Sequence, residues 1–338
     1  MLPLPLRSFW FLRCLSLAWI LAAALFATTP LPAQARDLDD LLTAVVRVKT
    51  SIEPDGRTVA TLGREREGSG VLIDTDGLVL TIGYLTVEAQ TAEIGFQDGR
   101  TIPANVVGYD HETGFGLLRA IFPPKVPALE LGSSADLSVG DPVLVASFGG
   151  PTMAVPARIS ARRAFAGSWE YLLEDAIFAT PLHPEWSGAA LVSRDGKLVG
   201  IGSLIVNDAR SGDTVPANMF VPVERLGPIL GDLLTHGRSS KAGRPWLGLT
   251  TNEVDGELVI ARVAPGSPAE RAGVQAGDVI SGVDGERPAD LADFYREVWA
   301  LGPAGVVVPL DLARDRAMHH VEIRSINRLD HLKLKASL

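Results

Sequence analysis

Short apolar runs separated by turn residues fill the chain from residue 41 to residue 223. Asp-Gly pairs follow several of these runs, for example Asp98-Gly99 and Asp195-Gly196. Asp-Gly between apolar runs is a strong hairpin signal, because tight hairpin turns need residues that tolerate positive φ. The repetition therefore predicts an all-β pair of barrels or sandwiches. The 34 glycines and 23 prolines among 338 residues agree with such a turn-rich chain.

The pattern changes beyond a flexible Gly/Ser-containing linker at residues 236–245. Strand-like segments at 246–250, 257–263, 278–283, 306–313 and 320–326 alternate with two helical segments. Ser267 and Asp290 stand where each helix would be capped. These features predict a small α+β domain. We expect segments at 1–35 (leader), 36–235 (β domain), 236–245 (linker), 246–330 (α+β domain) and 331–338 (tail).

Residues 1–35 have the form of an export signal. Arg7 and Arg13 precede an apolar run at 14–27, and Ala33-Gln34-Ala35 offers a small-residue cleavage site. A retained membrane anchor is the alternative, but it would need about 20 apolar residues, and Arg13 interrupts any longer window. We therefore predict cleavage after Ala35 and a periplasmic or secreted protein.

The charge and the cysteine content exclude several kinds of function. The whole chain has a net charge of −9, and loss of the leader leaves 29 basic and 40 acidic residues, or −11. Nucleic acid is disfavoured as a partner, because phosphate binding needs clustered Lys and Arg. The one cysteine, Cys14, would leave with the leader. The sequence has no metal-ligand spacing and no glycine-rich nucleotide loop, so we expect no metal and no cofactor.

A series of segments resembles the HtrA/Deg family (DegP- and DegS-like proteins), exported trypsin-like serine proteases with a C-terminal PDZ domain. The segments follow the family's order at 68–73, 98–100, 107–110, 131–141, 195–201, 220–223, 264–269 and 277–280. The resemblance implies a trypsin-like double β-barrel at 36–235 and a PDZ domain at 246–330.

The resemblance also identifies the catalytic positions, and only one residue fits. Proteases of this class use a Ser nucleophile, a His base and an Asp that orients the His. Ser187 stands at the nucleophile position, but Tyr84 stands in place of the histidine and Gly114 in place of the aspartate. Tyrosine has an ordinary pKa near 10, so using it as a base at pH 7 costs about 4 kcal/mol. The oxyanion hole would use the backbone N–H groups of Glu185 and Ser187, where Glu185 replaces a glycine.

Two histidines offer an alternative base. His183 precedes Ser187 by four residues, and His111 precedes Gly114 by three. Either could approach the cleft, although both are more simply interpreted as loop histidines. An active serine endopeptidase that uses Ser187 with a non-standard base is therefore the alternative function.

The PDZ resemblance implies a separate function in peptide binding. In PDZ domains a loop of exposed backbone N–H groups captures a peptide's C-terminal carboxylate, and the peptide adds a strand to a sheet edge. Trp246, Leu247, Gly248 and Leu249 match that loop, and Arg244 could add positive charge. Phe294, Tyr295, Val298 and Trp299 of the second helix could line the side-chain pocket, and we expect some of them to belong to the core.

Together these observations predict a catalytically inactive HtrA-like protein, or pseudoprotease. It would bind peptides, unfolded proteins or protein C-termini in envelope protein quality control or regulation. An active HtrA-type protease or a second copy of the chain is a further expected partner. A purely structural protein whose PDZ domain binds nothing is a third hypothesis.

Overall fold

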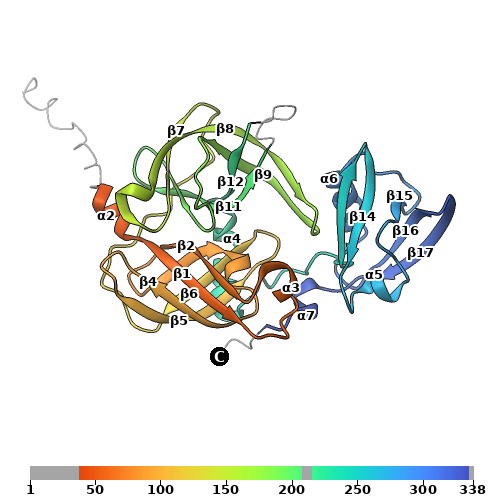
Figure 1. The fold of residues 1–338 in the computed structure, drawn as a ribbon, viewed down its shortest axis with the longest axis horizontal. Coiled ribbons are helices and arrows are strands. Elements are labelled where there is room, and N and C mark those ends of the chain that lie inside the picture. The colour runs from red at the N-terminus through yellow and green to blue at the C-terminus, as the bar shows by residue number, and fades with distance from the viewer. Residues whose placement is uncertain (1–37, 208–214, 335–338) are drawn as a thin grey trace, which may run out of the picture. The chain divides into compact units, whose positions relative to one another are not determined.

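The computed structural model describes residues 38–207 and 215–334, and its first part is a closed antiparallel barrel (Figure 1). The strands follow the order β1-β2-β3-β6-β5-β4. They are β1 (Val45–Ile52), β2 (Glu65–Leu72), β3 (Leu78–Ile82), β4 (Ala89–Gly95), β5 (Thr101–Tyr109) and β6 (Phe115–Ala120). Short helices accompany them at α2 (Leu38–Thr43), α3 (Val59–Leu62) and η1 (Gly83–Leu85). The predicted leader at 1–35 lies outside the described residues.

A second closed barrel repeats this topology with the order β10-β11-β12-β9-β8-β7. Its strands are β7 (Pro142–Ala146), β8 (Ala154–Gly167), β9 (Tyr171–Thr180), β10 (Ala190–Val192), β11 (Leu198–Val206) and β12 (Ala217–Pro222), with η2 (Gly150–Met153) between β7 and β8. Closure into a ring pairs every strand on both sides and removes free sheet edges. The predicted double β-barrel is confirmed.

A five-stranded antiparallel sheet forms the last part of the chain, as the sequence predicts. Its strands, in spatial order, are β13 (Leu249–Val254), β14 (Glu257–Val263), β15 (Val279–Val283), β16 (Val307–Arg314) and β17 (Ala317–Arg324). Two helices before this sheet, η3 (Val223–Arg225) and α4 (Gly227–His236), pack on the core of the barrels. The helices of the last part are α5 (Pro268–Arg271), α6 (Leu291–Ala300) and α7 (Arg328–His331). Ser267 and Asp290 cap α5 and α6 through their side chains, as expected.

The first strand of this sheet begins later than predicted. Expected at 246–250, it runs from Leu249 to Val254. Trp246 makes an isolated bridge with Ile326, and Gly248 has a φ of +90°. A residue in that conformation interrupts an extended strand. The amides of residues 247 and 248 are therefore outside the sheet ladder.

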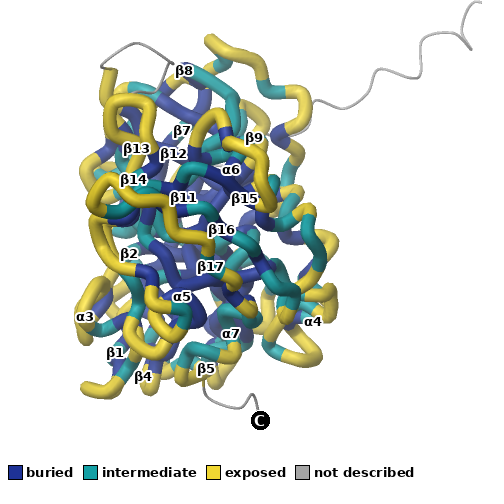
Figure 2. Tube along the Cα trace, turned by 90° about the vertical axis from the view of Figure 1, so that its right-hand side faces the viewer, coloured by how far each residue is buried: buried dark blue, intermediate teal, exposed yellow. Residues whose placement is uncertain are grey.

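The barrels and the last sheet have separate apolar clusters, which meet at the β8–β9 hairpin. Apolar side chains of both barrels share a large cluster, and those of β13–β17 and α6 form another. In Figure 2 the exposed positions gather mainly in the loops and turns. Leu172 of β9 belongs to the cluster of the last sheet, and Ala164 and Ala166 of β8 pack against it. Among the described residues, no helix combines the length and the apolar character needed to cross a membrane.

The two barrels meet closely at Ser69 of β2. Its N–H donates to the carbonyl oxygen of Ser187 at 2.7 Å, and its carbonyl oxygen accepts from the Thr81 hydroxyl at 2.7 Å. Gly188 follows Ser187 in the chain and has a φ of +71°. A Cβ built on Gly188 would lie 1.9 Å from the Ser69 carbonyl oxygen. This approach leaves no room for any side chain at position 188.

We predict that Gly188→Ala destabilises the protein by about 3 kcal/mol or more, because a left-handed backbone and a steric clash act together. Gly99→Ala is the matched control, since Gly99 has a φ of +85° with no atom within 4 Å of a built Cβ. It should cost only about 1–2 kcal/mol. Chemical denaturation measures both, and equal losses would contradict the proposed contact.

Candidate functional site

Tyr84 and Ser187 approach each other from different barrels. Tyr84 lies in η1 after β3, and Ser187 lies in the loop before β10. The Tyr84 hydroxyl donates to the carbonyl oxygen of Ser203 at 2.9 Å. Desolvation raises the pKa of Tyr84 to about 12, although Ser187 and Trp186 act in the opposite direction. The phenol is therefore protonated at neutral pH, and its proton is directed at a backbone carbonyl.

The Ser187 hydroxyl oxygen is buried, and its side chain interacts with the Tyr84 phenol, whose pKa it lowers against the effect of burial. A nucleophilic serine needs a neighbouring base that accepts its proton. Tyr84 does not offer one, because it is itself a protonated donor.

Gly114 lies in a tight turn between β5 and β6. Its φ is +81°, its N–H donates to the Asp110 carbonyl oxygen at 2.9 Å, and its own carbonyl oxygen accepts from Gly83 at 2.7 Å. A Cβ at this position would lie 3.2 Å from the Tyr171 hydroxyl oxygen. Backbone conformation and Tyr171 together restrict what side chain position 114 can carry.

The loop before Ser187 uses His183 as an internal support. The N–H of Glu185 donates to His183 Nδ1 at 3.0 Å, and His183 Nε2 lies 3.1 Å from the Met153 carbonyl oxygen. Nδ1 therefore accepts, and Nε2 carries the proton. Asn218 also holds the His183 backbone with two hydrogen bonds of 2.6 and 3.0 Å. Both ring nitrogens are engaged in the loop, as is the N–H expected to serve in the oxyanion hole.

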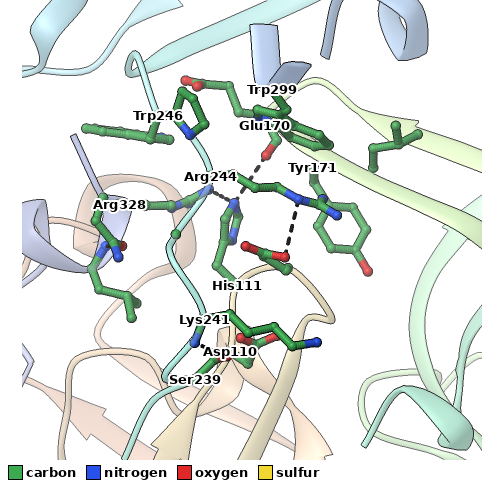
Figure 3. A pocket seen from close by; sticks show the side chains of 16 residues that line it. Asp110, His111, Glu170, Tyr171, Ser239, Lys241, Arg244, Trp246, Trp299 and Arg328 are labelled. Carbon is green, nitrogen blue, oxygen red and sulfur yellow. Dashed lines mark hydrogen bonds and ion pairs between the residues drawn. The ribbon is translucent and has the colours of Figure 1, made fainter. Parts of the chain in front are cut away.

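His111, the other alternative base, is engaged on the far side of Gly114. His111 Nε2 lies 2.8 Å from Arg328 and 3.2 Å from the Glu170 carbonyl oxygen, and Nδ1 lies 3.0 Å from the Tyr109 hydroxyl, so both ring nitrogens are engaged. Burial lowers the pKa of His111 well below its usual range, and Arg328 acts in the same direction. His111 is therefore neutral, and its side chain lines the small pocket drawn in Figure 3.

The loop predicted to bind a peptide carboxylate holds a carboxylate of this chain. The amides of Leu247, Gly248 and Leu249 donate to the Glu170 side chain at 2.8, 2.7 and 2.7 Å. The amide of Trp246, the fourth predicted residue, pairs instead with Ile326 at 3.0 Å.

Glu170 did not emerge from the sequence as a functional residue. It ends the Ser168–Glu170 turn between β8 and β9, has a φ of +58° and is 6% exposed. A glutamate in a short connection between strands normally faces solvent, so the sequence carries no signal for its role. Burial raises the pKa of Glu170 to about 7, while the three amides and Arg328 act in the opposite direction.

A small cavity of about 50 Å³ lies beside Glu170, next to His111 and Arg328 (Figure 3). Arg244, expected to attract a peptide carboxylate, pairs with Glu112 at 3.2 Å and lies over the Trp299 ring at 4.1 Å. Its charge is therefore already paired. No cluster of three or more metal-ligating side chains occurs in the described part of the chain.

The predicted pocket residues of α6 are mostly core. Phe294, Tyr295 and Val298 are almost fully buried, and Trp299 is partly buried with its ring stacked on that of Tyr295. The Tyr295 hydroxyl donates to the Gly167 carbonyl oxygen at 2.7 Å and accepts from the Glu170 N–H at 3.1 Å. This helix therefore holds the same turn that supplies the Glu170 carboxylate.

The raised pKa of Glu170 predicts a pH dependence of stability. The folded protein keeps this proton up to about pH 7, whereas an unfolded chain loses it near the ordinary value of 4.5. The free energy of unfolding should therefore fall as the pH rises through this window, by as much as about 3 kcal/mol. Urea denaturation at several pH values measures the slope.

Glu170→Gln should remove that contribution, because glutamine does not titrate. Glu257→Gln, at an exposed glutamate of β14, is the control and should keep the wild-type pH dependence. Equal slopes in the wild type and in Glu170→Gln would contradict the prediction.

Comparison with known proteins identifies the family. Residues 68–201 match the Trypsin-like peptidase domain family, and residues 259–314 match the PDZ domain family. A Synechocystis sp. protein named as serine protease HhoA is 30% identical over 285 residues, covering 77% of this chain and 71% of the relative. A Pseudomonas fluorescens protein named as a DegP-like periplasmic serine endoprotease is 29% identical, covering 77% of this chain and 57% of the relative.

A solved structure, the HtrA-type protease AlgW with a decapeptide, has the same fold. Its TM-score is 0.52 at 22% sequence identity, and the match covers 88% of this chain and 99% of that one. The double barrel, the sheet that follows it and the similarity to HhoA and DegP-like relatives agree. The chain belongs to the HtrA/DegP-type family of trypsin-like serine proteases with a PDZ domain.

Proposed function

We propose that this chain is an exported, non-proteolytic HtrA-type protein that binds peptides or protein C-termini through its PDZ domain, in envelope protein quality control or regulation. One observation carries the loss of proteolysis. Tyr84, at the position where the family has its histidine, directs its hydroxyl proton at the Ser203 carbonyl oxygen. Ser187 then has no base to receive its proton.

The energetics support this proposal. With a pKa of about 12, Tyr84 is ionised at pH 7 in about one molecule in 10⁵. Deprotonation alone would add about 7 kcal/mol to the barrier. Gly114 supplies no carboxylate, so nothing at the aspartate position could orient or stabilise a charged base.

The proposed oxyanion hole is also compromised. Its first donor would be the N–H of Glu185, which already donates to His183 Nδ1 at 3.0 Å. An oxyanion would have to compete with that bond, and a glutamate side chain at the same position places negative charge near it. The defect is therefore independent of Tyr84.

Relatives support the location and the ligand. The Pseudomonas fluorescens relative is named as periplasmic, and AlgW was solved with a decapeptide. A cleavable leader at 1–35, the barrels at 36–235, a linker at 236–245 and the PDZ domain at 246–330 would suit a periplasmic peptide-binding protein. Within the PDZ domain, the amides of Leu247, Gly248 and Leu249 are the proposed carboxylate donors.

One observation favours an active serine endopeptidase as the second candidate. The Ser187 hydroxyl oxygen is buried beside the Tyr84 phenol and lowers the pKa of that phenol, so the side chains at the nucleophile and base positions already interact. This candidate needs a base other than Tyr84, His111 or His183, all of which are engaged.

We predict that the purified protein neither cleaves denatured casein nor reacts with a fluorophosphonate probe above the level of Ser187→Ala. Without a base the serine stays protonated and a weak nucleophile. Gel-based cleavage and probe fluorescence between pH 6 and pH 9 measure both activities. Cleavage or labelling that disappears in Ser187→Ala would establish the second candidate instead.

We also predict that restoring the two triad residues does not restore proteolysis. Tyr84→His with Gly114→Asp should remain at the Ser187→Ala background. The introduced aspartate would need a φ near +81° beside Tyr171, and the Glu185 N–H stays bonded to His183. Casein cleavage is the assay, and thermal unfolding checks that the variant is folded. Ser187-dependent cleavage by this variant would show that a working oxyanion hole forms.

A further inference from the structure

The turn between β8 and β9 lies against the PDZ sheet in the way that a bound peptide would. β13 is an edge strand, paired only with β14 in the sheet. Along its free edge, Leu249 donates to the Glu170 carboxylate at 2.7 Å and Thr251 donates to the Ser168 carbonyl oxygen at 2.8 Å. Residues two apart on a strand direct their amides to the same side. The turn therefore satisfies the outward amides that an added strand would otherwise satisfy.

Glu170 fills the position of a peptide's last group. Three successive amides converge on its two carboxylate oxygens, with Leu247 bound to Oε2 and both Gly248 and Leu249 bound to Oε1. A run of backbone N–H groups of this kind is how proteins capture a C-terminal carboxylate. Each of these amides is a buried donor, and leaving it without an acceptor would lower the stability of the folded protein. Only one carboxylate can occupy the three donors at a time.

Contacts around the carboxylate hold the turn in place from the other side of the groove. The Tyr295 hydroxyl on α6 bonds to both Gly167 and Glu170. Leu172 inserts into the apolar cluster of the PDZ sheet. Arg296 of α6 pairs with Glu174 of β9 at 2.7 Å. Hydrogen bonds to Tyr295, apolar packing of Leu172 and one exposed ion pair therefore hold the β8–β9 turn against the sheet.

We propose that Glu170 is a built-in competitor of C-terminal peptides, so that a peptide binds the PDZ domain only by displacing the Ser168–Glu170 turn. This inference rests on the proposed peptide-binding function. The partner it selects is a chain with a free C-terminal carboxylate, which replaces the Glu170 side chain on the three amides. Binding would then release the β8–β9 hairpin of the second barrel from the PDZ sheet.

The test has one readout without peptide and one with it. Hydrogen–deuterium exchange of the segment 246–250 reports whether the three amides are covered. Fluorescence anisotropy reports binding of a labelled decapeptide pool whose last residue is Ala, Val, Leu or Phe, with free or amidated C-termini. The full chain is compared as wild type, Glu170→Ala, Glu170→Gln and the control Glu257→Ala.

We expect Glu170→Ala to speed exchange of the 246–250 segment at least tenfold and to tighten binding of the free-carboxylate pool at least tenfold, because the occupied fraction of the site falls. Glu170→Gln preserves the shape of the side chain and should change both measurements in the same direction. It serves as the second variant if Glu170→Ala is poorly folded. Glu257→Ala should match the wild type in both measurements.

The outcomes separate this inference from the proposed function. Equal affinity of the wild type and both Glu170 variants for the free-carboxylate pool, or unchanged exchange in both variants, would overturn the competition. If neither the wild type nor any of the variants binds free C-termini more tightly than amidated ones, the proposed peptide-binding function is wrong, and the competition is wrong with it. Added Gly248→Ala should abolish binding in the Glu170→Ala background, since a Cβ there would lie 2.2 Å from the Ser267 Cβ.

Discussion

The close approach of the two barrels at Ser69 fixes the backbone of the loop that carries Ser187. One backbone hydrogen bond joins Ser69 to Ser187, and Gly188 approaches Ser69 so closely that no side chain fits between them. Ser187 is therefore fixed by its backbone, whatever chemistry its side chain performs.

The neighbours of Ser187 form a consistent hydrogen-bonding arrangement without a substrate. The Tyr84 hydroxyl has an acceptor in Ser203, and the Glu185 N–H has one in His183. Buried donors must be satisfied, so these partners stabilise the resting protein. The proposed loss of proteolysis rests on these same bonds, because they engage the groups expected to act as the base and in the oxyanion hole.

Glu170 extends the same principle to the PDZ sheet. Its carboxylate satisfies three amides that a free PDZ loop would expose to water or to a peptide. The barrel and the sheet are thereby connected through the site at which a ligand is expected. An ionisable side chain with a raised pKa lies at that connection. The protonation of this one carboxyl group therefore affects both the packing and the proposed binding of peptides.

The sequence by itself determined the double barrel, the α+β sheet and the caps at Ser267 and Asp290, because turn pairs, apolar periodicity and capping residues act locally. It also marked Tyr84 and Gly114 through their place in a known order of motifs. Tertiary structure alone decided the later start of β13, the engagement of His111 and His183, and the capture of Glu170. Glu170 and its three amides lie 77 to 79 residues apart in the chain, and such distant pairs leave no local pattern.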